Sequence, residues 1–443
     1  MEYPGAKITR GVRRTVLAFF VIFFFVISPI IILYTVGYRY DWKNGLLKET
    51  GAISIDVLPK NTAAYLNGLK LKEKMPIRLN NITPAKYSLR LSLPGYYDWQ
   101  KEIEVKNKQT TYIKEFRLIK KDKAVLTAKG VYSDLTLSHN ERYLAYKEIQ
   151  NQNIKLWLID LESKNKSLIY ADKKDNDFDV VWGTKHLYLA ILPKKTPYER
   201  ALIINAESPD KIIDLVKETG EVVEKFQWRD STDPEVFFGA GNFIKNFFPQ
   251  TKQALVVANN KFIDWRMEGN NLWALQINTS TKKLTVLKDV LGFKSEMASL
   301  DSDSTEPWKI LFVHDNNVLL KKNSDQNITM IRPDKKFKFA GDKFLLSNYN
   351  NWWLIWTPWE LWTYSEKEDP YLLIRSGEKL AQILPLDEFN TLALLWEKKL
   401  TVLFPYYFIE QTLLSGEISS IAADTENRIL YYSDKDGIWK LSY

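Results

Sequence analysis

The chain has 443 residues, a formal net charge of +8 at pH 7 and no cysteine. Without cysteine it can form neither disulfides nor thiolate metal sites nor a cysteine nucleophile, so any exported part must be stabilised by packed cores and sheet hydrogen bonds. Residues 51–118 contain twelve Lys and Arg against six Asp and Glu, so much of the positive charge belongs to this one region.

The first element in chain order is an uncharged apolar run of 22 residues, 15–36. As a helix it would be about 33 Å long, enough to cross a hydrocarbon core of about 30 Å. We therefore expect a transmembrane helix that places the chain in a lipid bilayer. A cleaved signal peptide is the alternative, but its apolar core usually spans about 7 to 15 residues, and Thr35-Val36-Gly37 is a poor cleavage site.

Four basic residues precede this run and predict its orientation. They are Lys7, Arg10, Arg13 and Arg14. Because basic residues favour the cytoplasmic side, residues 1–14 are expected to form a cytoplasmic tail. After a juxtamembrane linker, residues 37–50, the rest of the chain would be extracytoplasmic. We predict a single-pass protein of the bacterial cytoplasmic membrane with its N-terminus in the cytoplasm.

Residues 51–118 have the pattern of a small β-sandwich of about six short strands. Apolar Ile53, Ile55 and Val57 alternate with polar residues, which is typical of a half-buried strand. Asn67-Gly68 lies between two short apolar runs and predicts a tight hairpin. The basic surface of this region favours solubility, or contact with anionic headgroups or an anionic wall polymer.

The same region resembles the PEGA domain, a short β module of bacterial and archaeal surface proteins. The residues that follow the order of its motif are Gly51, Pro59, the run Ala63-Ala64-Tyr65-Leu66-Asn67-Gly68, Pro76, Pro84 with Tyr87, and Pro94-Gly95-Tyr96. Two positions depart from the pattern, Met75 where Thr is usual and Ala85 where Gly is usual. The resemblance implies an extracytoplasmic recognition or spacer module without established catalytic residues.

Residues 124–443 show weak repetition at about 30 to 47 residues, which is typical of repeat architectures. The clearest unit, 134–170, is similar to the repeats of Tol-associated and prolyl-peptidase-type propellers. The matching segments are 138–146 (SHNERYLAY) and 156–161 (LWLIDL), with Asn140-Glu141 in place of the usual Asp-Gly turn. Further units are predicted to open near Phe178, Lys225, Phe262, Gly292, Phe337, Leu380 and Ile418.

These units predict a β-propeller over residues 123–443, with eight blades favoured and seven possible if one degenerate unit merges with a neighbour. The last unit is one strand short, because only three strands fit between Ile418 and Tyr443. The segment 123–129 (KAVLTAK) is a spare strand before the first unit. We expect it to complete the last blade and close the ring, which would leave only short protected edges.

The search for catalytic and metal-binding motifs yields no candidate residues and predicts no cofactor. The three histidines, His139, His186 and His314, fall in different predicted units and are interpreted as turn or surface residues. No nucleophile elbow, Walker loop or zinc-protease motif occurs. The segment 175–179 (DNDFD) begins like a calcium loop but lacks the Gly and Glu that such a loop requires, so a solvated turn is the default interpretation.

The segment 348–364 is rich in tryptophan and is the candidate partner or glycan surface. Its tryptophans are Trp352, Trp353, Trp356, Trp359 and Trp362. Exposed aromatic clusters mark interfaces and can stack on sugar rings. The alternative is propeller core, because inner strands alternate aromatic residues between packed sheets.

The sequence therefore predicts an all-β ectodomain, with a PEGA-like sandwich and a propeller, on one transmembrane helix. The favoured function is a non-enzymatic envelope scaffold that binds another envelope protein. A module that binds wall polymer or surface glycan is the first alternative, and a hydrolase using acidic residues in the propeller channel is a more distant one. A nucleic-acid partner is not expected, because the basic region lacks such a motif and would lie outside the cell.

Overall fold

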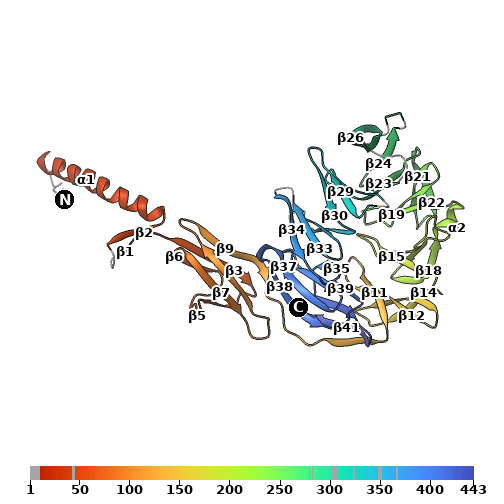
Figure 1. Cartoon of the computed structure of the whole chain (residues 1–443), viewed down its shortest axis with the longest axis horizontal. Coiled ribbons are helices and arrows are strands. Elements are labelled where there is room, and N and C mark those ends of the chain that lie inside the picture. The colour runs from red at the N-terminus through yellow and green to blue at the C-terminus, as the bar shows by residue number, and fades with distance from the viewer. Residues whose placement is uncertain are drawn as a thin grey trace, which may run out of the picture. The chain divides into compact units, whose positions relative to one another are not determined.

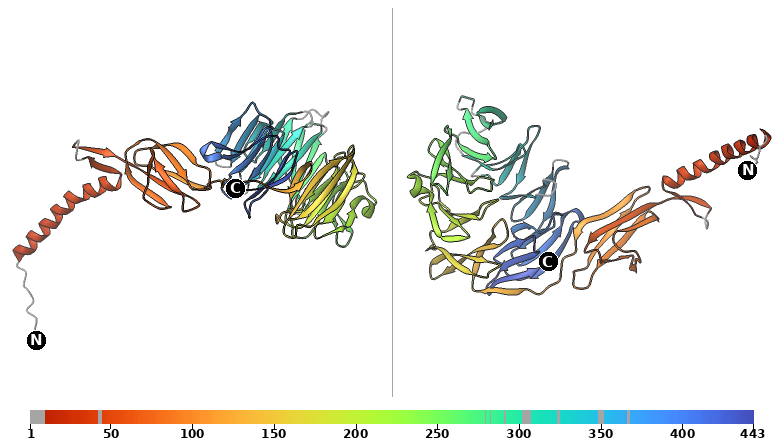
Figure 2. Two further views of the ribbon diagram at one scale, coloured as in Figure 1. Left: turned by 90° about the horizontal axis from the view of Figure 1, so that it is seen from below. Right: turned by 180° about the vertical axis from the view of Figure 1, so that it is seen from behind.

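The chain divides into two compact units, Met1–Asp122 and Lys123–Tyr443, shown as ribbons in Figures 1 and 2. The computed structural model describes residues 10–41, 45–278, 280–281, 283–290, 292–301, 307–322, 325–347, 352–365 and 368–443. Each unit has its own sheets and its own buried core.

The first unit begins with helix α1, Arg10–Thr35, whose segment Gly11–Thr35 is long and apolar enough to cross a membrane by length and composition. Its apolar side chains are mostly exposed, as expected for a helix whose partner is lipid. The helix starts five residues before the predicted span, so Arg13 and Arg14 lie within its first turns. Lys7 lies outside the described residues, and Arg10 is described only as the first helical residue.

A hairpin, rather than an irregular linker, follows the helix. Strand β1, Tyr38–Asp41, pairs with β2, Leu46–Glu49. Glu49 joins this hairpin to the following module, because its carboxylate lies 2.9 Å from Lys108 Nζ and accepts a hydrogen bond of 2.6 Å from Asn107. The Tyr38 hydroxyl also donates to Glu49 at 2.9 Å. The predicted linker is thus attached to the module that follows it.

That module consists of two small sheets packed on one apolar core. Its strands are β3 (Gly51–Leu58), β4 (Ala63–Leu66), β5 (Leu69–Lys70), β6 (Ile77–Ile82), β7 (Ala85–Ser92), β8 (Trp99–Val105) and β9 (Thr110–Arg117). One sheet has the order β6-β3-β9 and the other β5-β4-β7-β8. The predicted hairpin at Asn67-Gly68 is confirmed, with positive φ at both turn residues. Trp99 stacks on Phe116 inside the core, with ring centroids 4.9 Å apart.

The second unit contains eight four-stranded antiparallel sheets in the described part of the chain. The strands of the first four are β11 (Tyr132–Leu137), β12 (Tyr143–Gln150), β13 (Asn153–Asp160), β14 (Lys166–Lys173); β15 (Phe178–Trp182), β16 (Tyr188–Pro193), β17 (Leu202–Asn205), β18 (Ser208–Asp214); β19 (Lys225–Trp228), β20 (Val236–Ala240), β21 (Phe243–Phe248), β22 (Gln253–Asn259); β23 (Asp264–Glu268), β24 (Asn271–Asn278), β25 (Lys283–Val290) and β26 (Phe293–Asp301). A short helix, α2 (Leu215–Thr219), connects β18 to β19.

The remaining four sheets continue the same order. Their strands are β27 (Trp308–His314), β28 (Asn317–Lys322), β29 (Asn327–Ile331), β30 (Lys336–Ala340); β31 (Lys343–Ser347), β32 (Trp352–Trp356), β33 (Glu360–Ser365), β34 (Glu368–Arg375); β35 (Leu380–Pro385), β36 (Leu392–Trp396), β37 (Lys399–Phe404), β38 (Ile409–Ser415); β39 (Ser420–Asp424), β40 (Ile429–Ser433), β41 (Gly437–Ser442) and, in the same sheet as these three, β10 (Val125–Lys129). A 3₁₀ turn, Pro405–Tyr407, joins β37 to β38.

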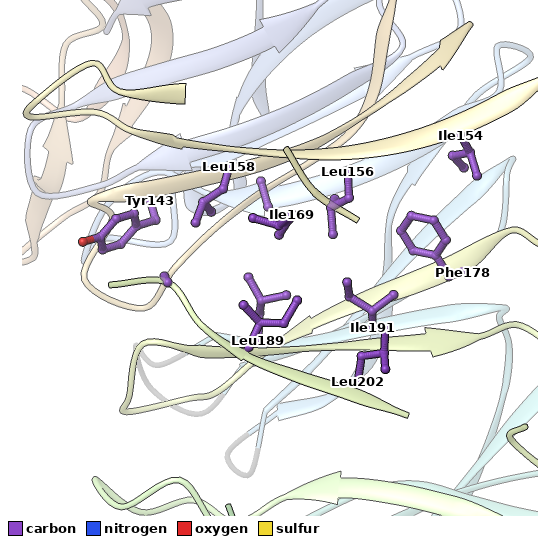
Figure 3. Close-up of a cluster of buried hydrophobic side chains, with 12 residues drawn as sticks. Tyr143, Ile154, Leu156, Leu158, Ile169, Phe178, Leu189, Ile191 and Leu202 are labelled. Carbon is purple, nitrogen blue, oxygen red and sulfur yellow. The ribbon is translucent and has the colours of Figure 1, made fainter. Parts of the chain in front are cut away.

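Each sheet packs face to face on the next, so the second unit is a β-propeller. Figure 3 shows this packing between the sheets β11–β14 and β15–β18, where Leu156 and Leu158 face Leu189 and Ile191. The last sheet packs on the first through Tyr431 and Ile438 against Leu144 and Tyr146. In Figure 1 the blue strands of the last sheet accordingly lie beside the orange and yellow strands of the first. Because both faces of such a sheet are covered, its inner strands are apolar on both sides.

The ring is closed by the strand that the sequence predicted. Strand β10 pairs antiparallel with β41, from Val125 opposite Lys440 to Lys129 opposite Gly437. Two predicted unit starts, at Gly292 and Phe337, are wrong. Gly292 lies in the turn between β25 and β26, and Phe337 lies within β30. In sequence, a glycine turn between the two outer strands of one sheet looks the same as the boundary between two units, which explains the error at Gly292.

The innermost strand of each sheet has a strand on only one side. On the other side, side chains of the inner strands form hydrogen bonds with the backbone of the next sheet. Gln227 donates to Met267 O at 2.6 Å and accepts from Met267 N at 3.0 Å in the next sheet. Gln382 forms the equivalent pair with Ile421, at 2.9 and 3.2 Å. Since unpaired buried backbone groups are costly, these amides stabilise the sheet-to-sheet junctions directly.

Gly437 provides a test of ring closure. A Cβ at this position would lie 2.1 Å from Ala128 O and 2.7 Å from Leu126 Cδ1, both in the closing strand. We expect Gly437→Ala to lower the free energy of unfolding by about 1–3 kcal/mol, because β10 must move to make room. Thermal unfolding of the full chain in detergent measures this. Gly377→Ala is the matched control, since no atom lies within 4 Å of the added carbon. Equal stability of the two variants would contradict this role for the β10–β41 pairing.

His186 lies in a turn, as predicted, but its ring is buried rather than on the surface. The side chain is 6% exposed, and its ring centroid lies 4.7 Å from that of Trp228. Its Nδ1 accepts a hydrogen bond from Tyr188 N at 3.2 Å. Burial disfavours the charged imidazolium and lowers the pKa of His186 to about 4.

This burial predicts a specific pH dependence of stability. The unfolded state binds the proton more tightly, because the pKa of an unperturbed histidine is about 6.5. The contribution of neutral His186 is therefore complete above pH 6.5 and is lost as the pH falls toward 4, at a cost of up to roughly 3 kcal/mol. His186→Asn should show a shallower loss of urea stability than the wild type between pH 6.5 and 4. Parallel slopes for wild type and His186→Asn would refute this assignment.

Candidate functional site

The connections of the propeller fall on two opposite faces. In an antiparallel four-stranded sheet, the connection that enters the first strand and the turn between the second and third strands lie at the same end. We call this end the cavity face. It comprises residues 174–177, 194–201, 241–242, 260–263, 357–359, 416–419 and 434–436. The opposite end, which we call the turn face, includes residues 138–142, 161–165, 183–187, 229–235, 269–270, 315–316, 386–391, 405–408 and 425–428.

The turn face is used for hydrogen bonds between neighbouring sheets. Glu141 of the first sheet accepts from Thr425 N at 2.9 Å and from Glu426 N at 3.0 Å in the last sheet. Arg229 donates to Asn270 at 2.8 Å, which joins two further neighbours. Lys185 lies 3.0 Å from Asp230 across another such junction. The polar side chains of these turns therefore act as ties within the ring.

Cavities, by contrast, open on the cavity face. One has a volume of about 430 Å³ and lies between the sheets β11–β14 and β15–β18. A second, of about 390 Å³, lies on the other side of the turn 194–201 and includes Lys225, Asp264 and Lys309. A third, of about 310 Å³, lies between the connection 416–419 and the turn 434–436. The cavities therefore lie between neighbouring sheets at this end of the ring.

The first of these cavities has an apolar floor that belongs to the core between the sheets β11–β14 and β15–β18. Phe178, Ile191 and Leu202 line it and are buried, and Figure 3 shows them at one end of the core cluster. Strand β15 starts at Phe178, and β17 starts at Leu202. The floor is thus fixed by two strand ends, so its shape depends on the rigid sheet and not on the turns above it.

A buried cation fixes one wall of this cavity. Lys147, on β12, is 3% exposed, and its ammonium lies 2.9 Å from Asp177 and 2.8 Å from Asp134. Lys194 also pairs with Asp177. Burial alone would raise the pKa of Asp177, but the hydrogen bonds from Lys194 and Lys147 outweigh it and hold that pKa below its usual range. The calcium-like segment 175–179 therefore presents Asp177 to two ammonium groups.

The opposite wall is built around Asp172, at the end of β14. This carboxylate accepts hydrogen bonds from Tyr170 at 2.7 Å and from Arg200 at 2.8 Å. Burial opposes its ionisation, yet the hydrogen bonds from Tyr170 and Asn176 lower the pKa of Asp172 to about 2. Burial, with the bond to Asp172, raises the pKa of Tyr170 to about 12. Asp172 therefore stays ionised and Tyr170 stays a neutral donor throughout the physiological pH range.

This arrangement provides charged groups of both signs around an apolar floor. Asp172 and Asp177 are held as carboxylates and Tyr170 as a phenol. Among the described residues, no group of three or more His, Cys, Asp and Glu side chains is placed to hold a metal ion. The geometry fits recognition of a segment with both apolar and charged side chains.

The tryptophan-rich segment does not form one exposed surface. Trp352, Trp353 and Trp356 lie on β32 and are buried, and Trp362, on β33, is half-buried. Trp352 packs on Tyr406, with ring centroids 4.7 Å apart. Trp359 differs, because it lies in the turn 357–359 of the cavity face and is 51% exposed. The predicted aromatic surface is thus reduced to one ring, since β32 has packed sheets on both of its faces.

Of the residues that line the cavity between the sheets β11–β14 and β15–β18, the segment 175–179 is predicted from the sequence as a solvated, calcium-like turn, whereas the turn 194–201 is not selected. A signal was present, because 194–201 is the longest turn between a second and a third strand in any of the eight sheets. Its sequence, KKTPYERA, combines both signs of charge with a proline and a tyrosine. The partners Asp172 and Lys147 come from a different sheet, and their proximity follows only from the packing of the sheets.

Truncation of a buried tryptophan and of an exposed tryptophan should change the free energy of unfolding by different amounts. Trp353→Ala removes a ring that is 1% exposed and should lower the free energy of unfolding by about 3–5 kcal/mol. Trp359→Ala removes a half-exposed ring and should change it by about 0.5 kcal/mol or less. Urea denaturation of the two variants, followed by circular dichroism, measures the difference. A large loss at Trp359 would show that this ring is part of the core.

Comparison with known protein families agrees with the first β module. The PEGA domain family matches residues 50–119, so this module is a PEGA domain. No curated protein matches the chain in sequence.

Solved structures are similar to the chain only at low identity. The Dos1 propeller has a TM-score of 0.45 and 10% identity over 72% of this chain and 94% of its own. The Cps50 (Swd1) propeller of Myceliophthora thermophila has a TM-score of 0.38 and 10% identity, covering 72% of this chain and all of its own. A prolyl endopeptidase has a TM-score of 0.39 and 11% identity over 83% of this chain, which spans 55% of that enzyme.

Proposed function

We propose that this protein is a membrane-anchored scaffold whose propeller binds another envelope protein through the cavity face, without catalysing a reaction. The observation that carries the proposal is the difference between the two faces. Polar side chains of the turn face are engaged in ties such as Glu141 with Thr425, whereas the cavity face is hollowed between sheets. A rigid surface with recesses of about 300–430 Å³ suits insertion of side chains from a protein partner.

The anchor supports a location at the bacterial cytoplasmic membrane. In this proposal α1 crosses the bilayer, residues 1–14 remain in the cytoplasm, and both β modules are extracytoplasmic. The basic residues Arg13 and Arg14 at the start of the helix support this orientation. The PEGA domain would then act as a spacer or a second recognition module between the membrane and the propeller.

Site-specific photo-crosslinking in intact membranes tests which face binds. A photoreactive residue in place of Lys195, exposed in the turn 194–201, should yield an adduct with another envelope protein. The matched control is Glu162 on the turn face, whose side chain is 71% exposed. Lys195→Glu combined with Glu199→Lys should weaken partner binding at least tenfold without changing the thermal midpoint, because it reverses two exposed charges on the cavity rim. Adducts at both positions, or only at Glu162, would contradict the choice of face.

Glycan binding is the second candidate, and Trp359 is the observation that favours it. A half-exposed indole on the cavity face can stack on a sugar ring. If the ligand is a wall polymer, the full-length protein should sediment with isolated cell wall in high salt, and Trp359→Ala should abolish this sedimentation. Sedimentation lost in high salt would instead indicate contact between an anionic polymer and the basic PEGA domain.

A further inference from the structure

The outer edge of one propeller sheet differs from all the others. Each sheet ends in an outermost strand with no strand beside it, and proteins usually protect such edges with charged residues or proline. Among the eight outermost strands that the structure describes in this unit, β22 alone has neither. Its sequence is QALVVAN, whereas β30 (KFKFA) has two lysines and β34 (EDPYLLIR) has three charges and a proline.

Strand β22 is also apolar on both of its faces and exposed on both. Leu255 and Val256 are consecutive, so their side chains point to opposite sides of the sheet, and Val257 follows at an irregularity in the pairing with β21. They are 58%, 57% and 43% exposed, respectively. A row of this kind on an unprotected edge is a template for pairing with a further strand.

The sequence of β22 indicates which strand would pair with it. The sequence is nearly symmetric about Val256. Toward the N-terminus it continues Leu, Ala and Gln, and toward the C-terminus it continues Val, Ala and Asn. An antiparallel pair of two identical copies would therefore place Leu255 opposite Val257, Ala254 opposite Ala258, and Gln253 opposite Asn259. Two identical strands meet in this way across a twofold axis, which is the commonest symmetry of protein dimers.

The surroundings permit this approach. Lys252, just before β22, has its ammonium 2.6 Å from Glu218 on α2, so its charge is compensated within the same chain. Strand β22 has one irregularity, at Val257, where its register with β21 shifts between Ala258 and Val256. Because a bulge increases the local twist, the contact should be short and centred on Val256.

We propose that two copies of this chain associate through an antiparallel pairing of their β22 strands about Val256. This surface lies on the outer rim of the propeller and does not use the cavity face, so the inference does not depend on the proposed partner. Two copies anchored in one bilayer would be held at high effective concentration, which favours such a short contact.

The chain offers a clean test because it contains no native cysteine. Residues directly opposite in an antiparallel pair have Cα atoms about 4.5–5.5 Å apart, which is within the range that a disulfide bridges. The full-length Val256→Cys variant, oxidised in intact membranes, should therefore form a covalent dimer of twice the chain mass. Leu168→Cys is the matched control, because it also lies on an outermost strand, β14, and is 48% exposed. It should form at least tenfold less dimer.

A charge at the centre of the strand gives the complementary result. Val256→Lys should abolish the dimer that light scattering detects for the wild-type protein in detergent, whereas Leu168→Lys should leave it intact. The thermal midpoint of each variant confirms that it is folded. Equal crosslinking at residues 256 and 168, or none at 256, would overturn the proposal. A crosslink from residue 256 to a different protein would also overturn it and would identify β22 as the edge for a partner's strand.

Discussion

Pairing of β10 with β41 is the interaction on which the propeller depends. Each sheet packs on two neighbours, so a break at one junction would expose the apolar faces of two sheets. At this junction the first strand of the propeller pairs with its last strand, Val125–Lys129 with Gly437–Lys440. The side-chain amides of Gln227 and Gln382 also hold neighbouring sheets together. They form hydrogen bonds with backbone groups at the inner edge of the next sheet.

The face-to-face packing of the sheets also determines where the propeller can bind other molecules. Sheets packed face to face leave only their ends and outer edges available to other molecules. One end is occupied by ties such as Arg229 with Asn270, and most outer edges are protected by charge or proline. The cavity face and β22 remain, and they differ in chemistry. The first combines charged walls with an apolar floor, whereas the second is an apolar strand at the outer edge of its sheet.

Much of the fold could be predicted from the sequence because it rests on local signals. An uncharged run indicated α1, Asn67-Gly68 indicated the hairpin, and the missing strand of the last unit indicated the role of β10. Unit boundaries at Gly292 and Phe337 were wrong, since tight turns within a sheet resemble those between sheets. The candidate site was less predictable. Burial of Trp353 and the approach of Lys147 to Asp177 depend on how neighbouring sheets pack on one another.

Closure by β10 also has a consequence for biosynthesis. The two strands of this pair are separated by roughly 310 residues, so at a translation rate of about 5–20 residues per second β10 waits about 15–60 s for its partner. The other strands of each sheet follow one another within a few seconds and can pair as they emerge. The ring is thus completed last, and a nascent chain that stalls before Gly437 presents an unpaired β10 edge to chaperones and proteases.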